Sequence, residues 1–400
     1  MIYQLPAGAR DLLPLDVAQK RWIEDRLREV FKSWGYHRII TPTLERLETL
    51  TAGGAVKPET VIQVLDAEEG VYLGLRPELT ASIARAAVTR MAGVTHPQRL
   101  YYVANIFRRQ PRGNNTGQHE FFQAGVELLG TPGTRANAEI LMLLEDSLQN
   151  LGIEEWHLVL GDAHLTQSLL ESFPAEHRDA IRDAIATLNE IDLKQMSLSD
   201  EHKERALGMM HLRGTPDEVI AKLRTWSLDE TQSASLDALE VLMALLPNSS
   251  LTLDLSLLQT YDYYTGIVFE VVSANGQHVL AQGGRYDELL SSYHPEGKVT
   301  PGVGFSMNIQ DLHQVLQSKN VLPQGTRQSE YLVVAESTAA TSHAFDQAAQ
   351  LRKSEGSRVC VEVELMERSS DEILAHAKER EISKIAWVND QGSVRIETLK

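Results

Sequence analysis

The sequence predicts an α+β fold over residues 1–320, followed by a small α/β domain. Three observations predict it. Apolar residues recur at helical spacing over residues 16–34. Strand-like runs such as QRLYYV and EFFQAGVELL occur between the helical segments. Beyond a linker at 321–330, short apolar strands and amphipathic helices alternate to the end of the chain.

The first helix is predicted over residues 16–34 and ends before Gly35, a natural C-terminal stop. A short strand, HRIIT, follows and ends at Pro42, and a second helix begins near Glu78. The helix at 134–150 is closed by Gly152 and precedes the strand WHLVL. The apolar positions that define the first helix are Ile23, Leu27, Val30, Phe31 and Trp34.

Residues 163–247 are predicted to be mostly helical, as an insertion within the first domain. The strand LTLDLSLL comes next, and VFEVVSANGQHVLAQ predicts a hairpin in which Asn275 and Gly276 supply two positive-φ positions. GVGFSM predicts a further strand, followed by a helix at 309–318. Residues 331–400 then predict the small α/β domain.

Composition limits the function classes. The net charge is 38 − 55 = −17, which disfavours a nucleic-acid-binding chain because such affinity depends largely on Lys and Arg. The only cysteine, Cys360, is expected to be a buried, inert thiol. The N-terminal segment lacks a signal-peptide core, and no run approaches the roughly 18 apolar residues of a membrane span. We expect a cytoplasmic protein without metal or cofactor.

The segment LRPELTASIAR places Arg76 and Glu78 on either side of Pro77 at the start of a helix. A carboxylate is favoured there by the free N–H groups of the first turn. These residues therefore fit a capped surface helix, and they also fit a ligand site.

The strand EFFQAGVELL carries Gln123 and Glu127 on one face, because alternate residues of a strand share a face. A buried carboxylate needs a donor partner. A ligand with an ammonium or imidazole N–H could supply that donor, and so could a structural arginine.

Two further segments are YDYYTG (261–266) and AQGGRYDELL (281–290). The tyrosines around Asp262 fit a pocket wall with hydroxyl groups, or core aromatics with satisfied hydroxyls. Gly283 and Gly284 permit close approach of the backbone, although a bulge is the usual reason for such a pair.

Taken together and in this order, these segments resemble the histidyl branch of the class II aminoacyl-tRNA synthetases over about residues 5–318. GARDLLP and GYHRIITPTLE are similar to its first motif, LRPE with FRRQ and EFFQAGVELLG to its second, and YDYYTG with GGRYD to its two histidine-specific segments. The resemblance implies a class II antiparallel sheet flanked by helices. It also implies a dimer formed through residues 1–60.

The departures from that family concern its ATP site. Gln259 stands where the resemblance places the arginine that faces the reacting phosphate, and Asp311 where it places the arginine that holds the ATP tail. Leu79 replaces the glycine of the second motif, and the loop after Arg108 differs. Charge-assisted hydrogen bonds contribute about 1.5–3 kcal/mol each, so two lost arginines cost roughly 3–6 kcal/mol. We expect no adenylate formation.

The positions that the family uses for the amino acid are retained. By resemblance, Glu78 would take the α-ammonium group, Glu127 the imidazole N–H, and the tyrosines would close over the ring. The histidine pocket implied by the resemblance consists of Glu78, Thr80, Arg108, Gln123, Glu127, Tyr263, Tyr264 and Tyr286.

A synthetase-like chain with these losses resembles the regulatory subunits of ATP phosphoribosyltransferase, the first enzyme of histidine biosynthesis. That family implies no catalysis by this chain, a complex with a short catalytic subunit, and histidine as a possible effector. The sequence shows no loop of the kind that binds phosphoribosyl pyrophosphate. The C-terminal domain resembles a reduced anticodon-binding domain, but from residue 321 it has 10 Lys and Arg against 13 Asp and Glu, so no tRNA partner is expected.

Two alternatives stay open on the sequence alone. One is an active histidyl-tRNA synthetase with substituted phosphate contacts. The other is a paralogue that ligates a different amino acid or acts on another nucleotide.

Overall fold

The computed structural model describes residue 5 and residues 8–109, 118–246, 250–257, 263–353 and 359–399. The chain divides into two compact units, one formed by Met1–Leu12 and Gln19–Leu322 and the other by Leu13–Ala18 and Pro323–Lys400. We propose 1–320, 321–330 and 331–400 as the limits of the synthetase-like domain, linker and small domain. Among the described residues, no helix combines the length and apolarity needed to cross a membrane.

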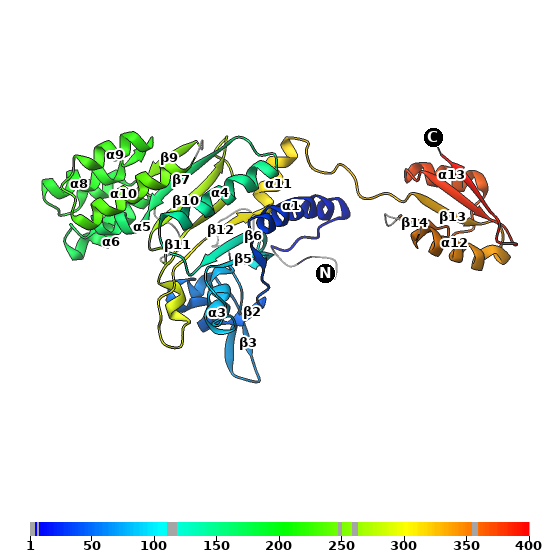
Figure 1. The fold of residues 1–400 in the computed structure, drawn as a ribbon, viewed down its shortest axis with the longest axis horizontal. Coiled ribbons are helices and arrows are strands. Elements are labelled where there is room, and N and C mark those ends of the chain that lie inside the picture. The colour runs from blue at the N-terminus through cyan, green and yellow to red at the C-terminus, as the bar shows by residue number, and fades with distance from the viewer. Residues whose placement is uncertain are drawn as a thin grey trace. The chain divides into compact units, whose positions relative to one another are not determined.

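A nine-stranded sheet forms the centre of the first unit (Figure 1). It is largely antiparallel, but two of its pairings are parallel, β1 with β5 and β7 with β9, so the sheet is mixed. In spatial order its strands are β1 His37–Arg38, β5 Gln98–Phe107, β6 Glu120–Leu129, β12 Gly302–Asn308, β11 Val279–Arg285, β10 Ile267–Ser273, β7 Trp156–Asp162, β9 Leu251–Asp254 and β8 Arg213–Gly214.

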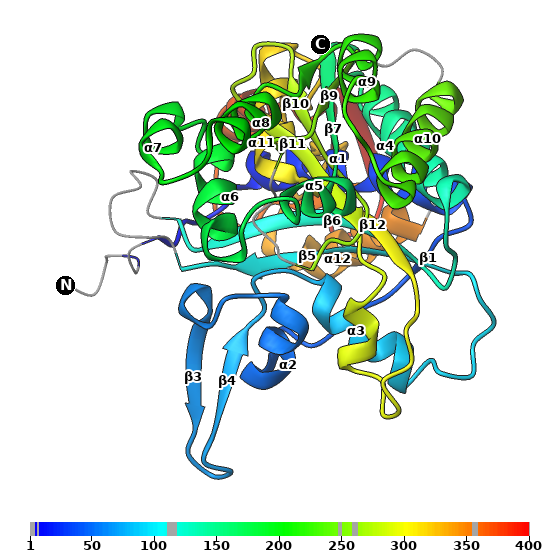
Figure 2. The same cartoon turned by 90° about the vertical axis from the view of Figure 1, so that its left-hand side faces the viewer.

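Helices cover both faces of this sheet (Figure 2). Buried apolar residues of α1, α4 and α11 pack on one face, and those of α2 and α3 pack on the other. The predicted helices near 16–34, at 134–150 and at 309–318 are present. The bounds of these helices are α1 Pro14–Ser33, α2 Leu47–Thr51, α3 Thr80–Thr89, α4 Thr134–Asn150 and α11 Ile309–Ser318.

The helical insertion predicted for residues 163–247 is present, although it also contributes the short strand β8. Its apolar residues join the same core as α1 and α4, so it extends that core beyond the sheet. The helices are α5 Ala163–Leu170, α6 Arg178–Ala186, α7 Glu190–Gln195, α8 Asp200–Met210, α9 Pro216–Arg224 and α10 Glu230–Leu245.

A second, three-stranded sheet was not predicted from the sequence. It consists of β2 Leu44–Arg46, β4 Val71–Leu75 and β3 Ile62–Asp66, and its β3–β4 hairpin extends away from the large sheet (Figure 2). The missed signal is QVLDAEEGVYL, in which two apolar arms flank an acidic turn closed by Gly70 at φ 68°.

The hairpin predicted for residues 268–282 is present as β10 paired with β11, but its turn differs from the prediction. Gly276 has φ 66°, whereas Asn275 is not among the positive-φ residues, so the two-residue turn is wrong. Instead, Asn275 Oδ1 accepts hydrogen bonds from Ser273 Oγ and from the Gln277 N–H. These side-chain bonds stabilise a longer loop.

The second unit contains a four-stranded sheet with one helix on each face. The predicted alternation of strands and helices is present, with the last strand antiparallel. Cys360, just before β14, is half-buried rather than buried as predicted. The sheet order is β14 Val361–Val363, β13 Tyr331–Ala335, β15 Lys384–Val388 and β16 Val394–Thr398, and the helices are α12 Thr341–Lys353 and α13 Ser370–Glu379.

Candidate amino-acid pocket

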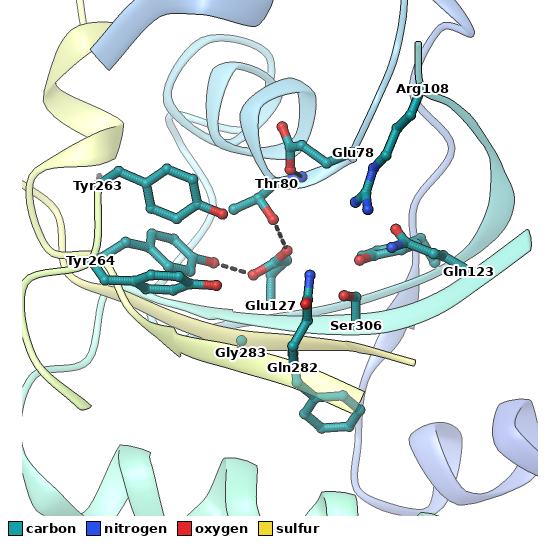
Figure 3. Close-up of a pocket in the computed structure, with 14 residues that line it drawn as sticks. Glu78, Thr80, Arg108, Gln123, Glu127, Tyr263, Tyr264, Gln282, Gly283 and Ser306 are labelled. Atoms are coloured by element: carbon teal, nitrogen blue, oxygen red, sulfur yellow. Dashed lines mark hydrogen bonds between the residues drawn. The ribbon is translucent and has the colours of Figure 1, made fainter. Parts of the chain in front are cut away.

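The face of the large sheet that meets α3 carries a small polar pocket. Alternation along β6 places Val126 in the core with α1 and α4, and Gln123 and Glu127 on the opposite face. All eight residues predicted for the histidine site line this pocket (Figure 3). They are Glu78, Thr80, Arg108, Gln123, Glu127, Tyr263, Tyr264 and Tyr286.

Glu127 is the central carboxylate of the pocket and is 2% exposed. Thr80 Oγ1 donates to its Oε1 at 2.8 Å, and the Tyr286 hydroxyl donates to its Oε2. Burial raises the pKa of Glu127 to about 8, with a smaller contribution from the negative charge of Glu78, although the two hydroxyl donors oppose that rise. At neutral pH the empty pocket therefore holds a proton on this carboxyl group.

Glu78 is a second buried carboxylate, at the start of α3. It accepts hydrogen bonds from the backbone N–H groups of Thr80 and Ala81, the latter at 2.9 Å. Burial raises its pKa, and those bonds and the positive charge of Arg108 counter the rise. Of the two interpretations left open for this segment, the capped surface helix holds only in part, because the side chain of Glu78 caps the helix but is buried.

Arg76 does not line the pocket. Its buried guanidinium donates to the carbonyl oxygens of Thr41 at 2.7 Å, Pro42 at 3.1 Å and Asn105 at 2.9 Å. It thereby connects the end of β4 with β5 and with the segment that contains Thr41 and Pro42. Arg108 lies at the pocket, and its Nε donates to the Pro77 carbonyl oxygen at 2.8 Å.

The tyrosines form one end of the pocket, and Arg108 and Gln123 lie at the other (Figure 3). The rings of Tyr263 and Tyr264 have centroids 4.8 Å apart, and Tyr263 meets Tyr286 edge-on at 5.8 Å. Burial raises the pKa of Tyr286 well above its ordinary value, so its hydroxyl remains a donor.

Gln123 is 6% exposed, and its Oε1 finds no donor among the described residues. A buried polar atom without a partner costs roughly 1–3 kcal/mol. The atom is therefore a candidate hydrogen-bond acceptor for a group outside the described residues.

Sequence reasoning missed several pocket residues on the neighbouring strands. Ser306 and Gln282 line it, and Gly304 lies beneath Glu127, where a Cβ would come within 2.1 Å of Glu127 Oε2. The available signal was the two-residue period of small side chains in GVGFSM. Gly283 and Gly284 pair regularly with β10, so close packing explains them and a bulge does not.

The cavity itself is small. Its volume is about 20 Å³, room for roughly one water molecule, and the empty space including its mouth is about 350 Å³. An amino acid therefore enters only if lining side chains move outward.

Asp311 does not line the pocket. It lies in the first turn of α11, and its Oδ1 is 3.1 Å from His278 Nδ1. Gln259, the other altered position, is outside the described residues, as are Tyr261, Asp262 and the loop 110–117.

Comparison with known proteins places this geometry in a family. The family model for histidyl-tRNA synthetase matches residues 8–312. A protein of Nostoc punctiforme, described as an ATP phosphoribosyltransferase regulatory subunit, is 52% identical over the full length of both chains. One of Cyanothece sp. with the same description is 53% identical, again over both full lengths. This chain belongs to the ATP phosphoribosyltransferase regulatory subunit family. The family resemblance predicted from the motifs is thereby confirmed.

Solved structures agree on the fold. A Bacillus halodurans protein described as an ATP phosphoribosyltransferase regulatory subunit/histidyl-tRNA synthetase is 28% identical, with a TM-score of 0.81 over 97% of this chain and 99% of that one. A histidyl-tRNA synthetase of Nostoc sp., 19% identical, has a TM-score of 0.76 over 99% and 97% of the two chains and supports the fold alone. The predicted class II synthetase-like α+β fold is confirmed.

Proposed function

We propose that this chain is the non-catalytic regulatory subunit of an ATP phosphoribosyltransferase, and that histidine binds in its pocket as a feedback effector. The transferase chemistry of this first step of histidine biosynthesis then belongs to a short catalytic partner. Membership of the regulatory family supports the first part. The retained pocket supports the second.

The observation that carries the histidine assignment is the enclosed carboxylate pair with an unsatisfied amide oxygen. Glu78 offers a carboxyl group at a helix start, Glu127 offers a second buried carboxyl group, and Gln123 Oε1 is an acceptor without a donor among the described residues. Histidine carries an α-ammonium group and an imidazole N–H, and these donors match the acceptors. Histidine regulates the complex if its affinity differs between two states of that complex.

Reconstitution tests the regulatory assignment. The short catalytic chain should be inactive or weakly active alone and gain activity when this chain is added. Histidine should then inhibit the mixture, and Glu127→Gln should remove that inhibition. Glu59→Gln, at an exposed position, is the matched control and should retain it. A catalytic chain unaffected by this protein would contradict the proposal, as would robust histidine-dependent ATP–pyrophosphate exchange by this chain alone.

We further propose self-association through the region of residues 1–60 and the adjoining small sheet. One face of that sheet carries the paired residues Leu44, Leu75 and Ile62 and, two residues along, Arg46, Leu73 and Val64. Leu44 is 41% exposed and Val64 is 44% exposed. Apart from Arg46 this face is apolar and partly exposed, and exposed apolar surface is common at protein interfaces.

Sedimentation of variants tests the dimer. Leu44→Asp combined with Val64→Asp should convert a dimer into a monomer, because each buries a charge in the proposed interface. Ile191→Asp, at a position 68% exposed on α7, is the matched control and should leave the mass unchanged. A wild-type monomer at micromolar concentration would contradict this part.

A further inference from the structure

The two carboxylates of the pocket are stabilised in different ways. Glu78 accepts backbone N–H groups of a helix start, which also supplies a partial positive charge. Glu127 lies on the sheet, with one hydroxyl on each of its oxygens, from Thr80 and from Tyr286. Both donors stabilise an ionised carboxylate. The site of Glu127 is thus arranged for an anion.

In the part of the chain that the structure describes, Glu127 has no cationic partner. Among the described residues, none forms an ion pair with Glu127, and burial raises its pKa to about 8. Arg108, the cation of the pocket, lies at the far end beside Gln123 (Figure 3). The charged and titratable groups that line the pocket around Glu127 are Glu78, Arg108, Tyr102, Tyr263, Tyr264 and Tyr286.

The net charge of the occupied pocket depends on the ring of the ligand. Burial raises the pKa of Glu78, whereas the N–H groups of Thr80 and Ala81 and the charge of Arg108 lower it. With both carboxylates taken as ionised, Glu78, Glu127 and Arg108 sum to −1. The α-ammonium and α-carboxylate of histidine cancel, so a neutral imidazole leaves −1 enclosed. A protonated ring brings the sum to zero. An uncompensated buried charge is strongly unfavourable, so the occupied pocket requires one more proton than two ionised carboxylates and a neutral ring provide.

We propose that the pocket binds histidine with a cationic imidazolium ring paired to an ionised Glu127. This inference rests on the proposed histidine site. On binding, the O–H bond of the Glu127 carboxyl group breaks and an N–H bond forms on the imidazole, so the proton moves within the complex and no other reactant is needed. The hydroxyls of Thr80 and Tyr286 remain on the carboxylate oxygens, and a charge-assisted N–H bond is added.

The proposal predicts a specific proton balance. The bound pair holds one proton. Between about pH 6.5, the ordinary pKa of imidazole, and about pH 8, the free partners also hold one, on Glu127, so no proton is exchanged. Above this range binding takes up a proton and the Kd for histidine rises about tenfold per pH unit. Below it binding releases a proton, and the Kd rises about tenfold per unit as the pH falls.

Calorimetry of the full chain tests this balance. Histidine is titrated from about pH 5.5 to about pH 9 in buffers of different ionisation enthalpy. The matched ligand is 1,2,4-triazolylalanine, which has the same α-groups and a ring that stays neutral in this range. Above pH 8 we expect each bound histidine to take up about one proton. The ring of the analogue should take up none, because it stays neutral. Glu127→Gln should abolish the difference between the two ligands.

The ¹⁵N spectrum of ring-labelled histidine bound near pH 7.5 locates the proton, and we expect two protonated ring nitrogens. A neutral-ring spectrum would overturn the proposal, and so would binding above pH 8 without proton uptake, or an unchanged pH profile in Glu127→Gln. These three results would leave the histidine site itself standing. Absence of histidine binding at every pH would overturn the site and the proposal together.

Discussion

Strand β12 contributes residues to the pocket and leads directly into α11. The two sites differ in whether their polar groups have partners within the described residues. In the pocket, Gln123 Oε1 has no donor among the described residues and Glu127 is buried without a cation. At the start of α11, Asp311 is 26% exposed and pairs with His278. The pocket thus keeps polar groups without partners among the described residues, whereas the acidic group at the start of α11 is paired within the chain.

The difference shows where this chain departs from the synthetase pattern and where it retains it. Asp311 stands where the family resemblance places the arginine for the ATP tail. The positive end of the helix dipole stabilises an acidic residue in the first turn. Asp311 therefore stabilises α11 locally. Glu127 has no such local advantage, because it lies on a strand and its burial disfavours the charged form. Glu78, by contrast, accepts backbone N–H groups at the start of α3.

The largest expected effect is the pH dependence that Glu127 gives to folding. Its pKa is about 8 when folded and about 4.3 when unfolded, so its contribution to stability is fully present below about pH 4.3. That contribution is lost as the pH rises through 8. Relative to Glu127→Gln, wild type should lose on the order of 3–5 kcal/mol between these limits, measured by urea unfolding. If the stability of wild type and Glu127→Gln changed equally with pH, the pKa of Glu127 would not be raised by folding. The exposed control Glu59→Gln should show such an equal change.

Gly304→Ala should disrupt histidine binding in the pocket without affecting α11. The added Cβ would lie 2.1 Å from Glu127 Oε2 and 2.4 Å from the Val126 carbonyl oxygen. Overpacking of this kind costs about 1–3 kcal/mol of stability, and we expect the Kd for histidine to rise at least about a hundredfold. Calorimetry and thermal unfolding measure both. Gly93→Ala, with nothing within 4 Å of the new Cβ, is the control. Unchanged histidine affinity in Gly304→Ala would remove the pocket from consideration.

Thr80→Val sharpens the comparison with a smaller change. The substitution keeps the shape and removes the hydroxyl that donates to Glu127 Oε1 at 2.8 Å. We expect histidine to bind about tenfold more weakly, since a hydrogen bond to a charged group contributes about 1.5–3 kcal/mol. Thr89→Val on the same helix removes a hydroxyl bonded to the Arg85 carbonyl oxygen and should leave affinity unchanged. Equal losses in both variants would indicate a general effect on α3.

The smallest effect is expected at the Asp311–His278 pair, at the start of α11. Asp311→Asn should cost less than about 1 kcal/mol, because its pair with His278 is partly exposed. His278→Gln should cost no more, and the double variant little beyond either single one. Histidine affinity, measured by calorimetry, should stay within about twofold. A larger change would mean that the α11 position communicates with the pocket.

Much of the fold was predictable because its signals are local. Apolar spacing and Gly35 predicted α1, and alternation along EFFQAGVELL placed Gln123 and Glu127 on one face. The small sheet was missed because its strands are short and separated by an acidic turn. The turn at Asn275 was wrong because side-chain hydrogen bonds support a longer loop than the Asn-Gly pair favours.

The candidate site was predictable only in its family-specific residues. Ser306, Gln282 and Gly304 carry no distinctive chemistry in the sequence, and they join the pocket because β6, β12 and β11 pair in register. The structural role of Arg76 was equally hidden, because its three carbonyl partners come from segments about 30 residues away.

By itself the sequence determined the order of helices and strands, the acidic composition and the motifs that mark the family. These follow from the type and spacing of neighbouring residues. Only the tertiary structure decided that Glu127 is enclosed and its pKa raised, that Asp311 pairs with His278, and that glycine lies beneath the central carboxylate. Burial and charge pairing depend on atoms brought together from distant parts of the chain, and packing of the whole sheet sets those distances.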